Sequence, residues 1–537
     1  MLHLAISFVI MALSVGERCF NLVLLILCLQ SMINMADSHY GGGSQNWLNH
    51  GGDIYNRRYA KDEVKISRKT VSQLKLKWKF FAGSNISATP AIYDGVVYFP
   101  SWNGYVYAVN AFDGSQVWNK SVHDLLGPDL STNTSLSRST PTIAGHDLLI
   151  IGIYGPAFVV AVRRLSGEFV WSTRLDAHSM SLITMSGTYF KGAYYIGTSS
   201  LEETTSIEQC CTFRGSMLKL NAKTGKIIWR TYMLPDNFGN RGEYAGAAIW
   251  GSSPSIDISR NHVYIATGNM YSAPPRIEEC QEKQNNQTTP PTDPDACIEP
   301  DNHSNSILAL DLDSGEIKWY KQLGGYDVWF FACIDLSTPG CPPGPNPDAD
   351  FSAAPMMLSV YVNGTKKDIV SAVQKSGFAW SLDRDTGEIL WFTEAGPGGF
   401  GGGGFWGAAT EGKRVYTNIN NSEGKNFTLK PSSENVTSGG WVAMNGADGR
   451  IIWTTGDPSN WTASGPVTIA NGVLFGGSTS PTGPFYAMDA RNGKILWTYN
   501  TGGTIFGGAS VSDGCVYIGN GYRFFSPGTS LFAFCIS

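Results

Sequence analysis

The sequence predicts an all-β protein that folds as an eight-bladed β-propeller. Three observations support this class: a composition rich in glycine and aromatic residues, a recurring hairpin motif, and incomplete repeat units at both ends. The 537 residues include 62 Gly, with 12% aromatic and 15% charged residues. Soluble domains usually carry roughly 25% charged residues. This balance is the opposite of that in a disordered chain, and it differs from that of a coiled coil.

The main evidence for the fold is a hairpin with glycine four residues before tryptophan. Each copy has an alternating strand such as YVYAVNA, a tight turn, and a second strand that contains the tryptophan. The seven tryptophans of these hairpins are Trp118, Trp171, Trp229, Trp319, Trp391, Trp453 and Trp497. Because a side chain repeated once per unit serves the repeat itself, we expect these tryptophans to pack between units.

A further strand pair precedes many of the hairpins, so each unit is predicted to be a four-stranded meander of about 40–50 residues, which is typical of propellers. At the N-terminus, LKLKWKFF supplies an eighth tryptophan, Trp78, with no hairpin partner, and the chain ends with SLFAFCIS, which lacks a tryptophan strand. Joining these ends in one shared blade closes the ring and removes exposed edges. The long insertion at 271–305 is rich in proline and polar residues and is expected to be a surface loop.

The N-terminus predicts export from the cytoplasm. Two apolar stretches, 4–15 and 20–29, are both shorter than the ~20 residues of a membrane span, and the second has the length of a signal-peptide core. We therefore expect a signal peptide at 1–36 and one propeller domain at 37–537. A short N-terminal anchor is the alternative. No other segment is long and apolar enough to cross a membrane, so no stable membrane span is expected.

Cysteines and glycosylation motifs support the same compartment. Cleavage near residue 36 would leave an even set of cysteines, which fits an oxidising environment, and sequence order suggests the pairs Cys280–Cys297, Cys333–Cys341 and Cys515–Cys535. Acceptor motifs for N-glycosylation lie at Asn85, Asn119, Asn133, Asn286, Asn302, Asn363, Asn420, Asn426, Asn435 and Asn460. The sequence thus predicts a secreted, disulfide-bonded glycoprotein. A net charge of -5 without a basic run argues against nucleic-acid binding.

The repeated pattern [ND]-x-x-[TSD]-G-x-x-x-W resembles the tryptophan-docking motif of quinoprotein dehydrogenases, whose eight-bladed propellers hold pyrroloquinoline quinone (PQQ). The resemblance covers nearly the whole chain after residue 40 and is greatest to the polyvinyl-alcohol dehydrogenase-like branch, which includes plant members. Non-enzymatic propellers share the motif, so the motif alone indicates the fold and not the activity.

The resemblance implies a calcium site. Asn269, in the sequence TGN after the strand HVYIA, resembles the family's asparagine ligand. Glu202, in IGTSSLEE, lies at the offset of the glutamate ligand, with Glu203 next to it as an alternative. Hard oxygen donors of this kind suit Ca²⁺. Taken singly, Glu202 also fits a solvated loop charge and Asn269 a turn residue.

The same resemblance implies a set of PQQ-binding residues. Arg138 aligns with an arginine that holds the cofactor's carboxylates, Lys375 with the cation at the quinone oxygen, and Trp250 with the tryptophan under the ring. The glycine-rich stretch 396–407 is expected to place Trp406 near the cofactor. Arg138 also fits a solvated loop residue, and Trp250 an ordinary core residue.

The catalytic base departs from the family pattern. Family members often carry Trp-Asp-Tyr, whereas YDVWFF here puts Phe330 in the place of the aspartate. Asp350, in DADFSAAPMML, resembles the same motif displaced by an insertion, and we predict it as the base and a possible calcium ligand. Asp327 is the second candidate.

The adjacent Cys210 and Cys211 are the second departure. Related alcohol dehydrogenases stack a disulfide between adjacent cysteines on the quinone, but there the pair precedes the arginine that Arg138 resembles. The two cysteines here therefore either cap the cofactor from another blade or bond elsewhere.

Together, these features predict a secreted oxidoreductase that uses PQQ and Ca²⁺ to oxidise a small or polymeric alcohol or polyol. No CxxCH motif for haem attachment is present, so a separate electron acceptor is expected. The alternative is a non-catalytic extracellular propeller that binds a protein or a cell-wall glycan.

Overall fold

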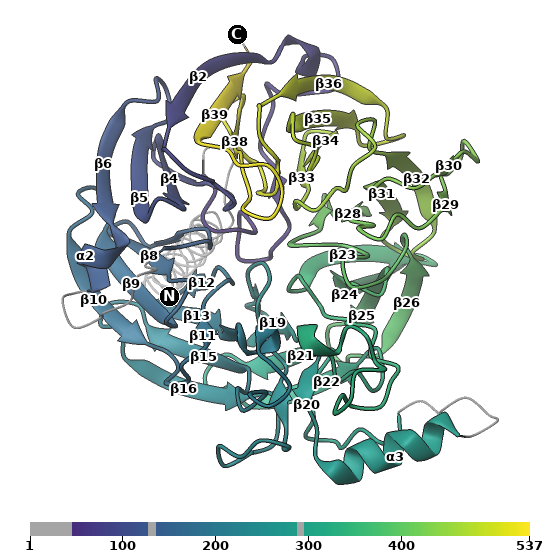
Figure 1. Cartoon of the computed structure of the whole chain (residues 1–537). Coiled ribbons are helices and arrows are strands. Elements are labelled where there is room, and N and C mark those ends of the chain that lie inside the picture. Colours follow the sequence, from purple (N-terminus) through teal and green to yellow (C-terminus); the bar gives the residue numbers. More distant parts are fainter. Residues whose placement is uncertain (1–45, 127–135, 287–294, 537) are drawn as a thin grey trace, which may run out of the picture. The chain divides into compact units, whose positions relative to one another are not determined.

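The computed structural model describes residues 46–126, 136–286 and 295–536. In these residues, eight sheets of four or five strands form blades around a common centre (Figure 1). The predicted eight-bladed propeller is confirmed. The expected signal peptide, residues 1–36, and the glycosylation motif at Asn133 lie outside the described residues.

Each blade is an antiparallel meander whose first strand lies nearest the centre. Blades 1 and 2 comprise β3 (Ala91–Tyr93), β4 (Val96–Ser101), β5 (Tyr105–Asn110) and β6 (Gln116–Ser121), then β7 (Thr142–Ala144), β8 (Leu148–Gly152), β9 (Phe158–Arg163) and β10 (Phe169–Arg174). Blades 3 and 4 comprise β12 (Thr188–Phe190), β13 (Ala193–Gly197), β15 (Ser216–Asn221) and β16 (Ile227–Tyr232), then β18 (Ser255–Asp257), β19 (His262–Ala266), β21 (Ser306–Asp311) and β22 (Ile317–Gln322).

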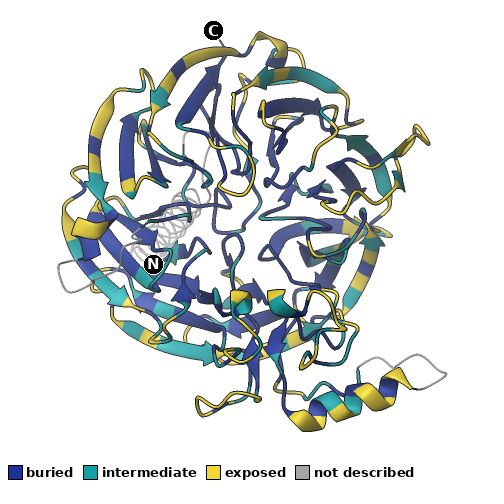
Figure 2. Ribbon diagram, in the orientation of Figure 1, coloured by how far each residue is buried: buried dark blue, intermediate teal, exposed yellow. Residues whose placement is uncertain are grey.

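The second half of the ring repeats this plan. Blades 5 and 6 comprise β23 (Met356–Val362), β24 (Thr365–Val373), β25 (Phe378–Asp383) and β26 (Ile389–Glu394), then β27 (Ala409–Thr410), β28 (Arg414–Ile419), β31 (Gly440–Asn445) and β32 (Ile451–Gly456). Blade 7 comprises β33 (Thr468–Ala470), β34 (Val473–Gly477), β35 (Pro484–Asp489) and β36 (Ile495–Asn500), and β1 (Tyr59–Ala60) joins it parallel to β33. Figure 2 shows the inner strands buried and the outermost strands only partly exposed at the rim.

Blade 8 closes the ring with strands from both ends of the chain. It contains β37 (Ser510–Ser512), β38 (Cys515–Gly519), β39 (Ser530–Cys535) and β2 (Lys75–Phe81). Trp78 of β2 pairs with Ala533 of β39, as the incomplete terminal units predict. The Cys515–Cys535 disulfide links paired residues of β38 and β39 in the same blade.

The repeated tryptophans join each blade to the next. Each indole Nε1–H donates to a backbone carbonyl of the following blade or, for Trp497, of Leu74 just before β2, with N···O distances of 2.9 to 3.2 Å. The turn glycine of the neighbouring blade lies against the ring. A Cβ on Gly449, whose φ is +72°, would lie 2.5 Å from Cε3 of Trp391. Glycine therefore serves both the left-handed turn and the close contact.

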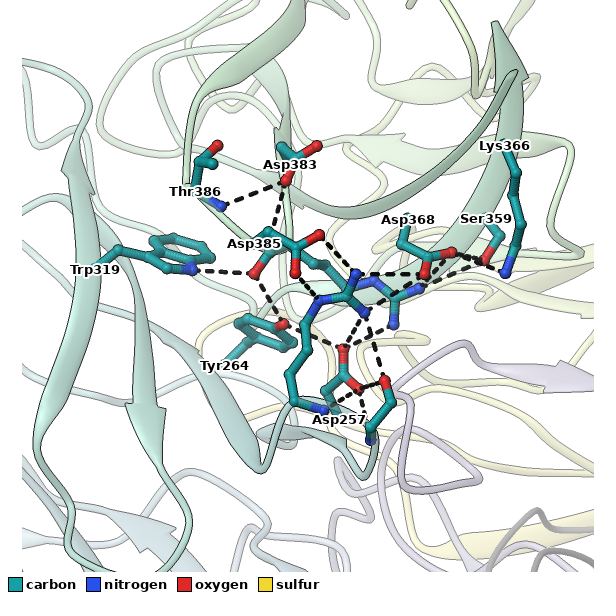
Figure 3. Close-up of polar contacts among 12 residues, drawn as sticks. Asp257, Tyr264, Trp319, Ser359, Lys366, Asp368, Asp383, Asp385 and Thr386 are labelled. Carbon is teal, nitrogen blue, oxygen red and sulfur yellow. Dashed lines mark hydrogen bonds and ion pairs between the residues drawn. The ribbon is translucent and has the colours of Figure 1, made fainter. Parts of the chain in front are cut away.

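Between blades 4 and 5, ion pairs accompany this docking (Figure 3). The indole of Trp319 donates to the carbonyl of Arg384, whose guanidinium lies 3.0 Å from both Asp257 Oδ2 and Asp368 Oδ1. Arg260 pairs with the same two aspartates. This network lies on the face of the tight hairpin turns.

The residues before the first blade form an inner segment, residues 47–60, that follows the innermost strands. Backbone hydrogen bonds connect it to Ile92 of blade 1, then to Ile143, Ile256, Met357, Thr410 and Ile469 of blades 2, 4, 5, 6 and 7. Its Arg58 is fully buried and donates to the carbonyls of Val467 and Ala509. The inner segment thus connects most of the blades at the centre of the ring.

The insertion at 271–305, expected as a loop, contains the helix α3 (Pro275–Asn285), which projects at the rim in Figure 1. Proline at its first position and the Glu, Gln and Lys residues that follow favour a helix. The expected disulfide Cys280–Cys297 ties α3 to the following chain. The remaining elements are α2 (Val122–Leu126), η1 (Val71–Gln73), η2 (Glu202–Thr204), η3 (Phe331–Cys333) and the pairs β11 (Ser181–Leu182) with β14 (Ser199–Ser200), β17 (Ala245–Gly246) with β20 (Met270–Ser272), and β29 (Phe427–Thr428) with β30 (Asn435–Val436).

Candidate functional site

All the predicted site residues lie in connections on one face of the propeller. In a four-stranded meander, the links between blades and those between second and third strands emerge on the same face, and the tight hairpin turns emerge on the other. Links between blades carry Arg138, Trp250, Asp327, Asp350 and Trp406, and links between second and third strands carry Glu202, Cys210, Cys211, Asn269 and Lys375. Topology alone therefore gathers residues far apart in sequence.

The best-defined group in the site is an ammonium held by two carboxylates. Lys375 Nζ lies 2.9 Å and 3.0 Å from the two oxygens of Asp348, and 3.0 Å from Oδ2 of Asp350. The other oxygen of Asp350 accepts the backbone N–H of Asn269 at 2.6 Å. Burial acts to lower the pKa of Lys375, but Asp348, Asp350 and Glu203 outweigh it and raise that pKa, so the lysine stays charged.

Asp327, the second candidate base, accepts hydrogen bonds from the backbone of the loop that carries Asp348 and Asp350. Its carboxylate accepts the backbone N–H groups of Asp348 and Ala349, at 3.2 and 2.7 Å, and the side-chain amide of Asn305 at 2.9 Å. Burial raises the pKa of Asp327 to about 6, although these hydrogen bonds oppose the rise. Asp327 therefore holds the loop that carries Asp348 and Asp350.

The two adjacent glutamates play different roles. Both Glu202 oxygens accept the N–H of Thr212 at 2.8 Å, one also accepts that of Phe213 at 2.7 Å, and His178 lies 3.3 Å away. Burial opposes ionisation of Glu202, but the hydrogen bonds from His178 and the backbone lower its pKa. In Glu203, burial raises the pKa to about 7, with Lys375 lowering and Asp350 raising it. Of the two glutamates, Glu203 is the one whose charge acts on the pKa of Lys375.

Cys210 and Cys211 form a disulfide next to Trp250, the tryptophan predicted to lie under the cofactor ring. Both cysteines belong to a hydrophobic cluster that also contains Trp250, Phe213 and Tyr271. The structure therefore brings this disulfide and Trp250 together. The disulfide suggested at Cys333–Cys341 is also present.

Two tryptophans link the lysine to the second cation of the site. Trp250 and Trp406 meet edge to face with centroids 4.9 Å apart. Lys375 Nζ lies 5.4 Å from the Trp250 centroid, and the guanidinium carbon of Arg138 lies 5.6 Å from the Trp406 centroid. The site therefore has a cation at each end of an aromatic pair.

Arg138 lacks a carboxylate partner among its described contacts. It donates to the hydroxyl of Tyr522 at 2.6 Å, and the rings of Trp102 and Tyr154 lie 5.2 and 5.0 Å from its guanidinium carbon. Its buried Nε and the buried Nε1 of Trp406 have no hydrogen-bond partner in the part of the chain that the structure describes. The adjacent cavity is lined by His50, Ser87, Ala88, Arg138, Ser139, Thr140, Thr184, Ser186, Ser252, Trp406, Pro466 and Phe506. Unpaired buried donors beside a cavity suit an anionic ligand.

Sequence reasoning missed three residues of this site. Asp348 is one of two aspartates in the DAD sequence, where only Asp350 resembles the family motif. Tyr522 lies in the connection between β38 and β39, and Tyr271 follows the TGN sequence. Burial and the nearby Glu203 and Asp350 raise the pKa of Tyr271 well above its ordinary value. The doubled aspartate was the one signal that the sequence offered.

Few side chains of the described residues are placed to hold a metal ion together. Within 46–126, 136–286 and 295–536, no three His, Cys, Asp or Glu side chains are grouped so that they could hold a metal ion. Asn269 donates its side-chain amide to the carbonyls of Met270 and Trp329 at 2.7 and 2.8 Å, which fixes its amide oxygen as a potential ligand. In the same described ranges, no helix has the length and apolarity to cross a membrane.

Two protein-family models match the chain. The model described as glucose/ethanol/alcohol dehydrogenase, beta-propeller domain, matches residues 297–397. The model described as outer membrane protein assembly factor BamB matches residues 70–189, 375–504 and 438–526. Together the matched ranges cover more than half of the chain.

The individual relatives and solved structures reported next are dehydrogenases by name. Polyvinylalcohol dehydrogenase of Pseudomonas sp is 28% identical in an alignment 516 residues long that covers 89% of this chain and 73% of the relative. The quinohemoprotein alcohol dehydrogenase structure from Comamonas testosteroni aligns with a TM-score of 0.69 and 18% identity, covering 94% of this chain and 82% of that one. A europium-containing methanol dehydrogenase aligns with a TM-score of 0.67 and 16% identity, covering 92% and 98%.

Proposed function

Since the chain belongs to the quinoprotein dehydrogenase family of PQQ-type β-propellers, we propose that it oxidises an alcohol with the help of bound PQQ and a calcium ion. The observation that carries this proposal is the buried Lys375–Asp350 pair, at 3.0 Å, on the face that also holds Trp250 and Arg138. Blade packing alone does not require a lysine and two aspartates there.

The residues present fit a planar, anionic quinone. Trp250 and the Cys210–Cys211 disulfide supply an apolar surface. The buried donors of Arg138 and Trp406 that lack partners suit carboxylate oxygens, and Lys375 suits a quinone oxygen. When bound, PQQ would accept the two electrons that leave the alcohol.

Asp350 is proposed to take the proton from the substrate hydroxyl. Its two oxygens are held by the Asn269 N–H and the Lys375 ammonium, so the carboxylate has a fixed orientation before substrate arrives. Lys375 stays protonated and stabilises negative charge that develops near it. Asp348 shares the same ammonium, and Asp327 keeps both aspartates in place by holding their loop.

Calcium is proposed to bind beside this group through the Asn269 amide oxygen, Asp350 and a glutamate. The sequence predicts Glu202 as that glutamate, but its carboxylate binds the backbone of Thr212 and Phe213. The charge of Glu203, by contrast, acts on Lys375, which pairs with Asp350, so Glu203 suits the role better. Two carboxylates and one amide are fewer oxygens than the 6–8 that Ca²⁺ takes. Ligands other than these side chains must complete such a site.

The proposal also covers the compartment in which the protein folds and the acceptor of its electrons. Four disulfides fit folding in an oxidising environment outside the cytoplasm. In keeping with the sequence predictions, we propose that the protein is secreted and N-glycosylated and passes electrons to a separate acceptor.

The proposal is tested with purified full-length protein, added Ca²⁺ and PQQ, a panel of alcohols, and reduction of an electron-accepting dye. We expect turnover that needs both additives and that falls at least 100-fold in Asp350→Asn and Lys375→Ala, with the exposed Lys413→Ala as control. PQQ binding is measured separately by equilibrium dialysis. If the wild-type protein binds no PQQ, the proposal is wrong, and the non-catalytic alternative takes its place.

A further inference from the structure

An aromatic wall, defined as Trp329, Phe331 and Phe400, lies on one side of the Lys375–Asp350 pair. The three rings pack together with centroid distances of 4.9 Å for Trp329–Phe331, 5.3 Å for Trp329–Phe400 and 5.4 Å for Phe331–Phe400. Trp329 is buried with 4% of its surface exposed, but Phe331 and Phe400 are exposed to 41% and 38%. The wall therefore has a buried base and an open apolar face.

The wall is fixed to the catalytic group by its backbone. The Trp329 carbonyl accepts the side-chain amide of Asn269, whose backbone N–H binds Asp350. On the other side, the N–H of Gly399, which precedes Phe400, donates to the carbonyl of Lys375 at 3.1 Å. Lys375 Nζ lies 6.0 Å from the centroids of both Trp329 and Phe400. A group bound on the wall therefore stays in register with the Lys375–Asp350 pair.

The loop closed by the Cys333–Cys341 disulfide follows Phe331 in the chain. Ile334 and Leu336 in this loop are exposed to 61% and 45%, and they alternate with the exposed polar residues Asp335 and Ser337. The exposed rings of Phe331 and Phe400, close to buried charges, offer contact area to apolar groups and no hydrogen bonds to hydroxyl groups. A short alcohol or a polyol gains little from such a surface.

We propose that the aromatic wall selects the substrate, and that the preferred substrate is an arylalkyl alcohol whose ring packs on Phe331 and Phe400 while its hydroxyl reaches Asp350. This inference rests on the proposed alcohol oxidation at the same site. Edge-to-face and offset ring contacts, together with burial of the two phenylalanines, provide the discrimination. Phe331 and Phe400 then act as specificity-determining residues.

The test measures binding as well as turnover. Saturation-transfer NMR and tryptophan fluorescence give the Kd of 2-phenylethanol, glycerol and a soluble cello-oligosaccharide for the full chain, with and without PQQ and Ca²⁺. We expect 2-phenylethanol to bind at least about tenfold more tightly than glycerol, and Phe331→Ala and Phe400→Ala each to weaken it by about tenfold. Phe112→Ala is the matched control, since Phe112 is 73% exposed in a turn of blade 1.

The outcomes separate this inference from the proposed function. Turnover without preference for the aryl alcohol, or equal affinity in all three variants, overturns the inference alone. Tighter binding of the oligosaccharide that is lost in the wall variants overturns it in favour of a sugar-stacking surface. Aryl binding that depends on the wall without any PQQ-dependent turnover contradicts the proposed oxidation and leaves the wall as a binding site.

Discussion

Lys375 and Asp348 form a buried ion pair in which the ammonium lies 2.9 Å and 3.0 Å from the two carboxylate oxygens. The same ammonium also holds Asp350. One positive charge thus keeps two carboxylates in a site from which water is largely excluded, so removing it affects stability as well as chemistry.

We predict that Lys375→Met lowers the free energy of unfolding by about 3–5 kcal/mol, because it leaves buried carboxylates without a partner. Adding Asp348→Asn recovers part of the loss, since one of the two unpaired charges is removed. Urea unfolding of both variants and of the exposed Lys413→Met measures the effect. Equal stability of Lys375→Met and the wild-type protein would show that the pair contributes nothing.

The adjacent glutamates are expected to differ in what their loss affects. Glu202→Gln replaces an acceptor of two backbone N–H groups and should cost about 1–3 kcal/mol of stability. Glu203→Gln leaves no backbone N–H without an acceptor, so it should cost less stability than Glu202→Gln but weaken Ca²⁺ binding. Urea unfolding and calorimetric Ca²⁺ titration of both variants separate the two roles. Loss of Ca²⁺ affinity in Glu202→Gln alone would reverse the assignment.

Two glycines test the packing of the repeated tryptophans. Gly449 and Gly364 have φ values of +72° and +79°, but only Gly449 has neighbours within 4 Å of an added Cβ, including the Trp391 ring at 2.5 Å. Both alanine variants suffer the strain of a left-handed backbone. Gly449→Ala should lose about 1–3 kcal/mol more, owing to overpacking against the tryptophan. Thermal and urea unfolding of the pair measures the difference.

His303 should make stability depend on pH. Burial lowers its pKa in the folded protein to about 4, against an ordinary value of 6.5, although Asp301 opposes the shift. As the pH falls through 6.5, the unfolded chain binds a proton that the folded protein does not. Stability should therefore fall by about 3 kcal/mol between pH 7 and pH 4 relative to His303→Gln.

This comparison is made at each pH between the wild-type protein and the His303→Gln variant. Asp327 acts in the opposite direction, because its raised pKa of about 6 favours the folded state at low pH, and its contribution cancels in the difference. A difference that stays constant from pH 7 to pH 4 would contradict the prediction.

Solvent exposure divides the glycosylation motifs into two classes. We expect glycans at the exposed sites, which are Asn119, Asn286, Asn363, Asn426, Asn435 and Asn460. The buried Asn85 accepts the N–H of Gly528 and the buried Asn420 donates to Gly401, so neither side chain has room for a sugar in the folded protein. The buried Asn302 belongs to the same class. Peptide mass spectrometry of protein secreted from a eukaryotic host measures occupancy, and a glycan on Asn85 in folded protein would contradict this division.

The fold was predictable from sequence because the tryptophan and glycine of each hairpin recur at fixed spacing, and the same spacing revealed the incomplete units that β2 and β39 complete. The site was predictable in outline, since Lys375, Asn269 and Trp250 lie in connections whose position follows from the meander. Hydrogen-bond partners were not predictable. Nothing in the sequence indicates that Glu202 uses its carboxylate on backbone N–H groups, or that Asp348 shares the ammonium of Lys375.

The inner segment, residues 47–60, bears on how substrate and product can approach the site. It bonds to the innermost strand of one blade after another, and the fully buried Arg58 fills space at the middle of the ring. Within the described residues, the chain itself therefore occupies the middle of the ring, while the site residues lie in connections on one face of the propeller. In an enzyme of the proposed kind, alcohol, product and electron acceptor would share the approach from the face of those connections.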